Sequence, residues 1–292
     1  MKQLLRVLGK QMKFNQLGIL LLALPFLFGF TDIAHRGENQ LGKYSEHSFA
    51  AYDHASADDA NYLELDLQKT KDKVLVVSHD DNLSRVFGVD QEIGKSNFKT
   101  LQQARNYSGE PLHSLQEVFQ RYQVDPEIKF MIETKDDVAG KGMERPLVRL
   151  VKKYHLGNRV LFESFSDSSL ALLRKLAPNI PQMQLGGDYH QLGQYGYYAN
   201  GFYDPQAARY LAAHDKGYII WGVNRPQAMR RMMLTGKVSG IMTDYSNRMQ
   251  HVVAQPNLLP VHRIHGVAIV SKPFVISQNG EHVFPKNTHR FD

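Results

Sequence analysis

The stretch YLELDLQKTKDKVLVVSHDDNLSR, residues 62–85, indicates the fold of this chain more clearly than any other segment. Its first part alternates apolar residues with Glu64 and Asp66, and alternation with a period of two is typical of a β-strand. A polar turn near Thr70 leads into a second apolar run that ends at His79. The segment therefore predicts two short strands, each carrying side chains that can perform chemistry.

The same pattern continues outward from this stretch. Short β-rich runs alternate with amphipathic helical patterns, which predicts βα units and a parallel sheet. Eight runs favour an α/β fold of the TIM (β/α)8 barrel type over residues 32–245, and no G-x-G-x-x-G follows the first run. The predicted strands are Asp32–His35, Tyr62–Leu67, Val74–Ser78, Lys129–Thr134, Arg159–Ser164, Gln182–Leu185, Tyr218–Val223 and Gly240–Thr243. The helical patterns include Ser114–Tyr122, Ser168–Leu176, Asp204–Lys216 and Pro226–Leu234.

Two segments fall outside this repeat. Residues 80–113 form a long polar excursion, and loops of that length are usually functional lids or subdomains. Residues 246–292 follow the last predicted strand as a C-terminal extension. In this extension Asn279-Gly280 separates two β-rich runs, Phe274–Gln278 and Glu281–Phe284, which predicts a β-hairpin.

The N-terminal residues 1–31 predict a signal or anchor segment. Four basic residues precede the uncharged run LGILLLALPFLFGF, residues 17–30. A helix needs about 20 residues to cross a bilayer, and extending the run to residues 14–31 brings it near the lower limit. The basic flank favours a cytoplasmic N-terminus. We therefore expect an extracytoplasmic barrel anchored in the membrane by residues 14–31, with secretion after signal cleavage as the alternative.

Composition excludes several classes of protein. The chain has 292 residues, 42% of them hydrophobic, which is inconsistent with a disordered protein. Its net charge is +6, but the excess lies largely in the N-terminal segment, and no basic stripe interleaved with aromatic residues predicts nucleic-acid binding. Cysteine is absent, which excludes disulfides, a thiolate nucleophile and a zinc–thiolate site.

Polar side chains gather where the predicted strands end, and in a βα barrel all these ends share one rim. These pairs are His35 with Arg36, Glu64 with Asp66, His79 with Asp80, Glu133 with Lys135, Trp221 with Asn224, and Thr243 with Asp244. Three carboxylates converging there would repel one another unless a cation neutralised them. Oxygen ligands without thiolates indicate one hard divalent cation, Mg²⁺ or Ca²⁺.

Two histidines and two cations at the same rim describe a site that moves protons around a phosphate. Imidazole titrates near neutral pH, so His35 and His79 can act as acid and base. Arg36 and Lys135 can hold anionic oxygens, Arg as a bidentate fork and Lys as a point charge.

An ordered set of motifs resembles the glycerophosphodiester phosphodiesterase family between Asp32 and Tyr245. The motifs are IAHRG, SEHSFAAY, YLELDLQKTKDKVLVVSHDDNLSR, PLHSLQEVF, FMIETK, VLFESF, WGVN and GIMTDYS. The resemblance implies an eight-stranded barrel that cleaves phosphodiesters. By this resemblance, the catalytic acid/base pair is His35 and His79, the metal ligands are Glu64, Asp66 and Glu133, the phosphate-contacting cations are Arg36 and Lys135, and Trp221 is an aromatic residue near the substrate pocket.

The chain departs from the family pattern at two turns. The family usually has P-E-N-T after H-R-G, and Ser45-Glu46-His47-Ser48 stands there in this chain. Glu46 keeps the acid and can serve as an outer ligand or as a partner of Arg36. Lys73 replaces the usual glycine of the Thr-Lys-Asp-Gly turn.

The resemblance implies metal-dependent hydrolysis of a glycerophosphodiester to glycerol 3-phosphate and an alcohol, with a small-molecule or lipid-derived substrate. Three alternatives remain: a lysophospholipase D, a teichoic-acid-type polyglycerophosphate hydrolase, and a catalytically silent surface-binding protein. We expect specificity to depend on residues 80–113, the Tyr-rich residues 189–203 and the C-terminal extension. The oligomeric state is left open.

Overall fold

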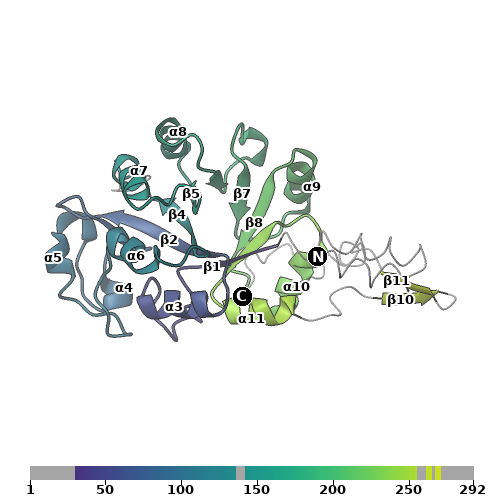
Figure 1. Ribbon diagram of the computed structural model, residues 1–292, viewed down its shortest axis with the longest axis horizontal. Coiled ribbons are helices and arrows are strands. Elements are labelled where there is room, and N and C mark those ends of the chain that lie inside the picture. The colour runs from purple at the N-terminus through teal and green to yellow at the C-terminus, as the bar shows by residue number, and fades with distance from the viewer. Residues whose placement is uncertain (1–29, 136–141, 255–260, 265–266, 271–292) are drawn as a thin grey trace. The chain divides into compact units, whose positions relative to one another are not determined.

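The computed structural model describes residues 30–135, 142–254, 261–264 and 267–270. Eight parallel strands of this part of the chain close into a ring, in which β9 pairs with β1 and β1 pairs with β2 (Figure 1). The ring order is β1 (Thr31–Ala34), β2 (Tyr62–Lys69), β4 (Lys129–Thr134), β5 (Val160–Ser164), β6 (Gln182–Leu185), β7 (Tyr197–Asn200), β8 (Gly217–Trp221) and β9 (Gly240–Thr243). The predicted TIM barrel is confirmed.

Helices surround the ring (Figure 1). They are α3 (Phe49–Ala57), α6 (Leu115–Tyr122), α7 (Glu144–Lys153), α8 (Asp167–Leu176), α9 (Pro205–Ala213), α10 (Pro226–Leu234) and α11 (Ser246–Val253). Sequence signals fix several of their starts: Ser114 and Glu117 form a capping box at α6, and Asp204 caps α9 just before Pro205. Between β6 and β7 the 3-10 turn η2 (Tyr189–Gln191) takes the place of a helix.

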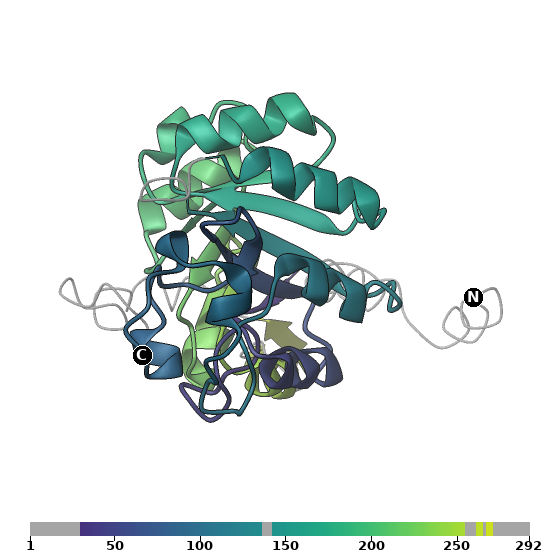
Figure 2. The ribbon, with the colours of Figure 1, turned by 90° about the vertical axis from the view of Figure 1, so that its left-hand side faces the viewer.

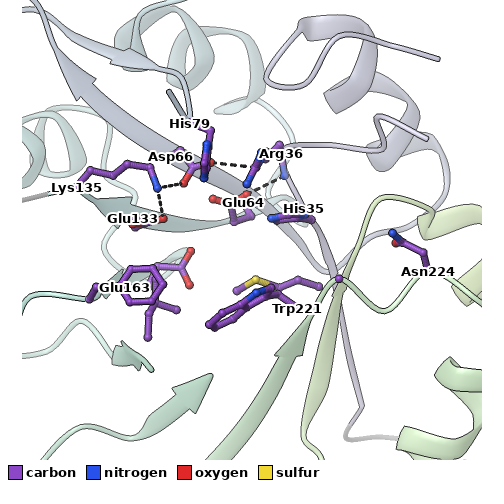
Figure 3. A pocket seen from close by; sticks show the side chains of 14 residues that line it. His35, Arg36, Glu64, Asp66, His79, Glu133, Lys135, Glu163, Trp221 and Asn224 are labelled. Carbon is purple, nitrogen blue, oxygen red and sulfur yellow. Dashed lines mark hydrogen bonds and ion pairs between the residues drawn. The ribbon is translucent and has the colours of Figure 1, made fainter. Parts of the chain in front are cut away.

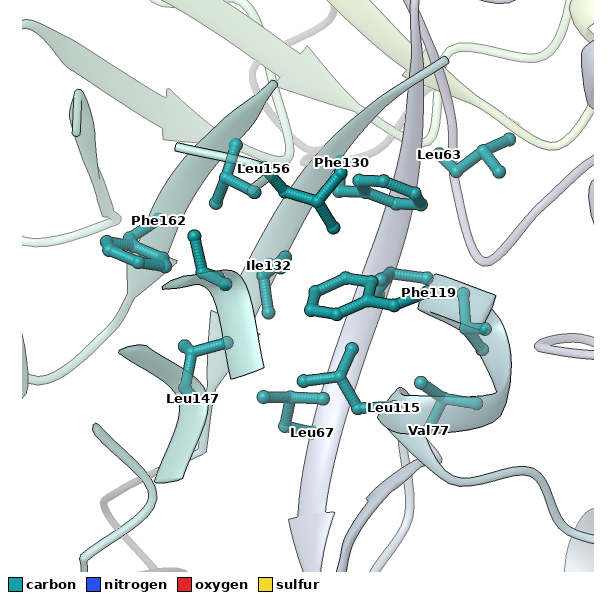
Figure 4. Close-up of a cluster of buried hydrophobic side chains, with 14 of the residues drawn as sticks. Leu63, Leu67, Val77, Leu115, Phe119, Phe130, Ile132, Leu147, Leu156 and Phe162 are labelled. Carbon is teal, nitrogen blue, oxygen red and sulfur yellow. The ribbon is translucent and has the colours of Figure 1, made fainter. Parts of the chain in front are cut away.

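The apolar core has two layers separated by the sheet. Between the strands and α6 and α7, side chains such as Leu115, Phe119, Phe130 and Leu147 pack together (Figure 4). Inside the ring, residues from seven strands form a second cluster: Ile33, Met131, Leu161, Met183, Leu185, Ala199, Ile219 and Met242. From β2 the partly buried Tyr62 packs against this inner cluster, and the acids Glu64 and Asp66 occupy the next two positions on the same face of the strand.

One predicted barrel strand is wrong and one was missed. Val74–Ser78 was expected in the barrel, but β3 (Leu75–Val77) pairs antiparallel with β2 as a hairpin outside the ring. The eighth ring strand is β7, inside the Tyr-rich residues 189–203, for which we predicted no strand. Its sequence YYAN is short and follows no helical pattern, so the βα period did not reveal it.

The excursion after β3 is a small subdomain. It contains α4 (Ser84–Phe87), η1 (Ile93–Lys95) and α5 (Phe98–Leu101), which lie together at one side of the barrel (Figure 2). These short elements enclose their own apolar cluster, formed by Val76, Leu83, Ile93, Leu101 and Leu112. The excursion is therefore an ordered part of the fold.

Both predicted terminal segments lie largely outside the described residues. Thr31, which we assigned to the anchor, is the first residue of β1. No helix among the described residues is long and apolar enough to span a membrane. At the other end, α11 packs against β1, so the barrel continues past residue 245. β10 (Val261–Ile264) and β11 (Val267–Val270) pair antiparallel, and the hairpin predicted at Asn279-Gly280 lies outside the described residues.

Candidate active site

The carboxyl ends of the ring strands enclose one cavity that contains every residue predicted for the site. These residues are His35, Arg36, Glu64, Asp66, His79, Glu133, Lys135 and Trp221 (Figure 3). Glu163, Phe165, Leu185, Gly222, Asn224 and Met242 line the same cavity. Residues far apart in sequence meet here because the parallel strands all end at the same rim.

Strand register arranges the acids in a row. Asp66 of β2 pairs with Glu133 of β4, which pairs with Glu163 of β5, so three carboxylates lie side by side on neighbouring strands. Glu64 lies two residues before Asp66 on the same face of β2. All four acids are buried. Because residues two apart on a strand share a face, the alternation in LELD and IET points Glu64, Asp66 and Glu133 into the barrel mouth.

Asp66 is the most heavily paired of these acids. Its carboxylate lies 2.8 Å from Nζ of Lys135, 3.0 Å from Nε2 of His47 and 3.3 Å from Nε of Arg36. Burial alone would raise the pKa of Asp66, but Lys135, the hydrogen bond from His47 and Arg36 hold it well below its usual range. Asp66 is therefore a carboxylate at neutral pH.

The neighbouring acids have too few positive partners. Burial, together with repulsion from Asp66, raises the pKa of Glu64 and Glu133 well above the ordinary value. The same two causes raise the pKa of Glu163 to about 8. Among the described residues that line the cavity, Arg36 and Lys135 are the permanently charged cations that face these acids. The donor set fits a hard divalent cation, which would neutralise the surplus negative charge.

The described residues include one compact group that could hold a metal ion: His47, Glu64 and Asp66, whose ligand atoms lie within 4.8 Å of one another. Glu133, which was predicted as a ligand, is absent from this group and lies 2.7 Å from Nζ of Lys135. His47 is the unpredicted member. Its Nδ1 lies 2.8 Å from the hydroxyl of Tyr52, so the ring is held on both sides.

Each of the two predicted catalytic histidines has its Nδ1 held by an aspartate. Nδ1 of His35 lies 3.0 Å from Asp244, and Nδ1 of His79 lies 2.7 Å from Asp80. Such a contact fixes the tautomer of each ring. Nε2 is then the nitrogen that can exchange protons in the cavity, which both histidines line. Asp244 also accepts hydrogen bonds from the side chains of Asn39 and Asn224, which anchor it in the barrel wall.

An ion-pair chain ties the excursion to Arg36 in the cavity. Arg85 of α4 donates to Asp80 at 2.6 Å and binds both oxygens of Glu46 at 2.6 and 2.7 Å. Both carboxylate oxygens of Glu46 in turn lie 3.4 Å from Nη1 of Arg36. The structure thus places Glu46 as a partner of Arg36, one of the two roles that we considered.

The loop formed by residues 45–48, which stands where the family usually has P-E-N-T, lies against the start of α3. Ser48 caps α3, accepting a hydrogen bond from the backbone N–H of Ala51 at 3.0 Å. His47 adopts φ +57°, a left-handed conformation that histidine tolerates better than most residues. Gly37 has φ +79°, and a Cβ there would lie 2.9 Å from the backbone of Ala51. The loop therefore packs directly on α3.

Sequence reasoning missed several residues that complete the site. Glu163, Phe165, His47 and Arg85 all lie within motifs that we quoted, but spacing alone gave no reason to select them. Glu163 had one usable signal, since it lies near the end of a buried strand, two residues after the inward-facing Leu161. Trp221 lies in the cavity, with its ring edge-to-face against Phe165 at 6.0 Å between centroids.

Comparison with known proteins agrees with this geometry. Residues 35–248 match the model of the glycerophosphoryl diester phosphodiesterase family. A glycerophosphodiester phosphodiesterase of Caldanaerobacter subterraneus is 31% identical, over 73% of this chain and 93% of the relative, and one of Bacillus subtilis is 28% identical, over 73% and 83%. A solved phosphodiesterase of Oleispira antarctica, in complex with its product sn-glycerol-3-phosphate, superposes with a TM-score of 0.66 at 21% identity, covering 78% of this chain and 98% of that structure.

Proposed function

Because the chain belongs to the glycerophosphodiester phosphodiesterase family, we propose that it hydrolyses a glycerophosphodiester to glycerol 3-phosphate and an alcohol by histidine acid/base catalysis. It is a phosphoric diester hydrolase. One observation carries the proposed mechanism: His35 and His79 line the same cavity, and each has Nδ1 held by an aspartate. Acid/base cleavage of a phosphodiester requires one group that takes a proton from the nucleophile and another that gives a proton to the leaving group. The Nε2 atoms of these two imidazoles can serve as that pair.

The two histidines divide the proton transfers. One accepts at Nε2 a proton from the nucleophile, which is either water or the substrate's own neighbouring hydroxyl, and the other donates a proton from Nε2 to the leaving alkoxide. When the substrate hydroxyl attacks, the product is a cyclic phosphate, which water then opens to glycerol 3-phosphate with the two proton transfers reversed. Asp244 and Asp80 stabilise the imidazolium that forms at each ring in turn, as a carboxylate partner does in other histidine sites.

Arg36 and Lys135 bind the phosphate oxygens. Both are already placed by carboxylates, Arg36 by Asp66 and Glu46 and Lys135 by Asp66 and Glu133, so their side chains need little reorganisation when an anion binds. Preorganised cations of this kind stabilise charge that develops in a transition state.

Glu64, Asp66 and Glu133 would hold the divalent cation, Mg²⁺ or Ca²⁺, and His47 would orient Asp66 through its Nε2. When bound, the cation draws charge from a phosphate oxygen. Support comes from the buried surplus of carboxylates and from the compact group His47, Glu64 and Asp66. The backbone N–H of Arg36, which donates to Glu64 at 2.8 Å, fixes one of these carboxylates against the turn that follows β1.

Phosphodiester cleavage by the full chain tests the proposal. The substrates are glycerophosphocholine, a lysophospholipid and a polyglycerophosphate, each assayed with Mg²⁺, with Ca²⁺ and with a chelator. We expect turnover of a glycerophosphodiester that the chelator abolishes. A preference for the second or third substrate would indicate a lysophospholipase D or a cell-wall polymer hydrolase. A folded, cation-binding protein without turnover on any of them would support the catalytically silent binding role and contradict the proposal.

We also propose that the barrel lies outside the cytoplasm, anchored by the apolar segment that precedes β1. The support is the sequence alone: four basic residues, then the uncharged residues 17–30 directly before Thr31. Proteolysis of intact cells is the test. External protease should degrade the barrel, and the protein should sediment with membranes; release into the medium would indicate signal cleavage, and full protection would contradict the proposed location.

A further inference from the structure

The outer face of α7 carries only positive charge. Every exposed residue of this helix is a cation, and together they form what we call the cationic row: Arg145, Arg149, Lys152 and Lys153. None of the four forms an ion pair with an acid in the part of the chain that the structure describes. The one acid of α7, Glu144, is only 2% exposed. The neighbouring α8, in contrast, exposes both Asp167 and Lys175.

The spacing of the cationic row places it on one side of the helix. Its members are separated by four, three and one residues, whereas Leu147, Val148 and Val151 on the opposite side are buried in the core. Arg145, Arg149 and Lys153 follow one another at intervals of about 6 Å along the helix axis, because an α-helix rises about 1.5 Å per residue. The row is therefore a line of charges at regular intervals.

The stability of α7 does not explain this arrangement. Like charges four residues apart, as in Arg145 with Arg149 and Arg149 with Lys153, repel each other and weaken a helix. Lys152 and Lys153 in the last turn face the negative end of the helix dipole, but Arg145 in the first turn faces the positive end. A partner with repeated negative charges would offset this repulsion.

Buried hydrogen bonds join the start of α7 to the strand end that lines the cavity. Glu144 accepts a hydrogen bond from Oγ of Ser169 at 2.8 Å, and that hydroxyl lies 2.7 Å from Oγ1 of Thr134. Thr134 stands between Glu133 and Lys135, which both line the cavity. In a βα barrel each helix runs back from the carboxyl end of its strand, and α7 lies outside the ring (Figure 1). The row therefore starts near the rim of the cavity and leads away from it.

We propose that the cationic row binds a polymer of repeated phosphodiesters, one unit of which occupies the cavity while further phosphates lie along α7. This inference rests on the proposed function, since it names the substrate class of the same site. In polyglycerophosphate one three-carbon unit separates successive phosphates, and this spacing is similar to that of the cations in the row. Cations that neutralise phosphates release their counterions, so binding strengthens with the number of phosphates and weakens with salt.

Two other polyanions fit the row less well. Helices that bind an anionic membrane surface also insert apolar side chains, and α7 has no exposed apolar residue. Sites for single-stranded nucleic acid combine cations with aromatic rings on which bases stack, and α7 contains no aromatic residue. A chain of phosphates that lacks both bases and acyl groups matches a surface that offers charge alone.

Binding to the full chain in the presence of a chelator is the direct test. No residue of the row belongs to the proposed metal group, so the chelator stops turnover without affecting the row. Titration calorimetry should show that long polyglycerophosphate binds at least about tenfold more tightly than glycerophosphoglycerol. The logarithm of Kd should rise with the logarithm of salt concentration with a slope of about 3, since each contact contributes about 0.7 to 0.9.

Variants identify the surface responsible. Changing all four residues of the row to Gln, which has a similar helix propensity, should weaken polymer binding by about tenfold or more and remove most of the salt dependence. Binding of glycerophosphoglycerol should not change. The matched control removes the same charge from four scattered exposed positions and should bind as wild type: Lys71→Gln, Lys99→Gln, Arg209→Gln and Lys237→Gln. Glu127→Gln, which removes a negative charge at an exposed position, should also bind as wild type.

Three outcomes would overturn the proposal. Polymer affinity could be the same in wild type and the row variant, or it could fall equally in the row variant and the scattered control. Anionic lipid vesicles or DNA could also bind through the row more tightly than polyglycerophosphate, which would assign the row to that partner. If the row variant does not fold, the single change Arg149→Gln decides, because it should lower the salt slope by about one quarter.

Turnover gives a second, separable readout. In wild type, kcat/KM should rise with the length of the polyglycerophosphate chain, and the row variant should lose this dependence while it retains kcat on glycerophosphoglycerol. A wild-type chain that binds the polymer through the row but cleaves neither substrate would refute the proposed function and leave the row intact. Turnover without any dependence on chain length or on the row would refute the row alone.

Discussion

The two sides of the cavity differ in how completely their charged groups are paired. On the side formed by β1, β2, β3 and β4, a chain of ion pairs runs from Asp80 through Arg85, Glu46, Arg36 and Asp66 to Lys135 and Glu133. On the side formed by β5 and β8, Glu163 has a buried oxygen without a partner and Phe165 is half exposed.

We infer from this difference that the paired side of the cavity carries out the reaction and that the unpaired side selects the substrate. Groups that act on the phosphate must be held in one geometry before the substrate arrives, and cross-linked ion pairs achieve this. Groups that recognise the alcohol have no partner before the substrate arrives, and their interactions form only when it binds. We therefore expect substitutions on the paired side to lower turnover of every substrate, and substitutions on the unpaired side to change which substrate is preferred.

The largest effect should follow Glu64→Gln. Glu64 is a buried acid of the metal group, and the change removes its negative charge while it keeps the shape of the side chain. Cation binding and turnover should be lost together, by about 10³-fold or more, for all substrates. Calorimetric titration with Mg²⁺ and Ca²⁺ and a chelator-controlled assay measure both. Full metal-dependent turnover would exclude Glu64 as a ligand, and Glu127→Gln is the control.

His79→Ala should reduce kcat by about 10²–10⁴-fold and leave the thermal midpoint unchanged. Its side chain is 39% exposed at the rim, where it pairs with Asp80, so its removal should leave no buried cavity. Comparing an alcohol leaving group with p-nitrophenol in His35→Ala and His79→Ala identifies the acid, because loss of the acid matters least for a good leaving group. A loss below tenfold in His79→Ala would assign that residue a structural role.

Arg85→Gln should lower kcat by about 10-fold to 10²-fold without contact to the substrate, because Arg85 positions Asp80 and Glu46. A double-mutant cycle distinguishes positioning from general destabilisation. If Arg85 acts through His79, the change should have little further effect in the His79→Ala background. Additive losses in the double variant would contradict the ion-pair chain.

The smallest effect on turnover should come from an acid buried outside the cavity. Burial raises the pKa of Asp32 to about 8, which is above its value in an unfolded chain. The folded state therefore binds more protons, and its stability falls as pH rises from about 4 to about 8, by about 1.4 kcal/mol per pH unit from this group. Asp32→Asn should remove that slope.

Urea unfolding at pH 5, 6.5 and 8 measures this effect. The variant should gain stability over wild type as pH rises, with turnover unchanged. An identical pH dependence in both proteins would show that Asp32 is not protonated in the fold. Together with Glu64→Gln, this experiment distinguishes a buried acid whose charge a cation neutralises from a buried acid whose charge a proton neutralises.

The sequence predicted the barrel and the paired side of the cavity well. Period-two alternation in LELD and IET indicated which acids face the barrel mouth, and the ordered motifs indicated that His35 and His79 meet there. The sequence misassigned β3, because a hairpin strand and a ring strand have the same local pattern. It missed β7, because that strand is short and follows no helical pattern. Only the hydrogen-bonded register shows which strand closes the ring.

What the sequence by itself determined was the set of reactive side chains and their placement at strand ends, because the period of a strand decides which residues share a face. The tertiary structure alone decided the partners of those side chains. His35 and Asp244 are 209 residues apart, and Arg85 and Glu46 are 39 apart, so only closure of the ring and folding of the excursion bring them together. The same closure left Glu163 beside two rings without a counter-charge, because pairing depends on distance in space and no local pattern encodes it.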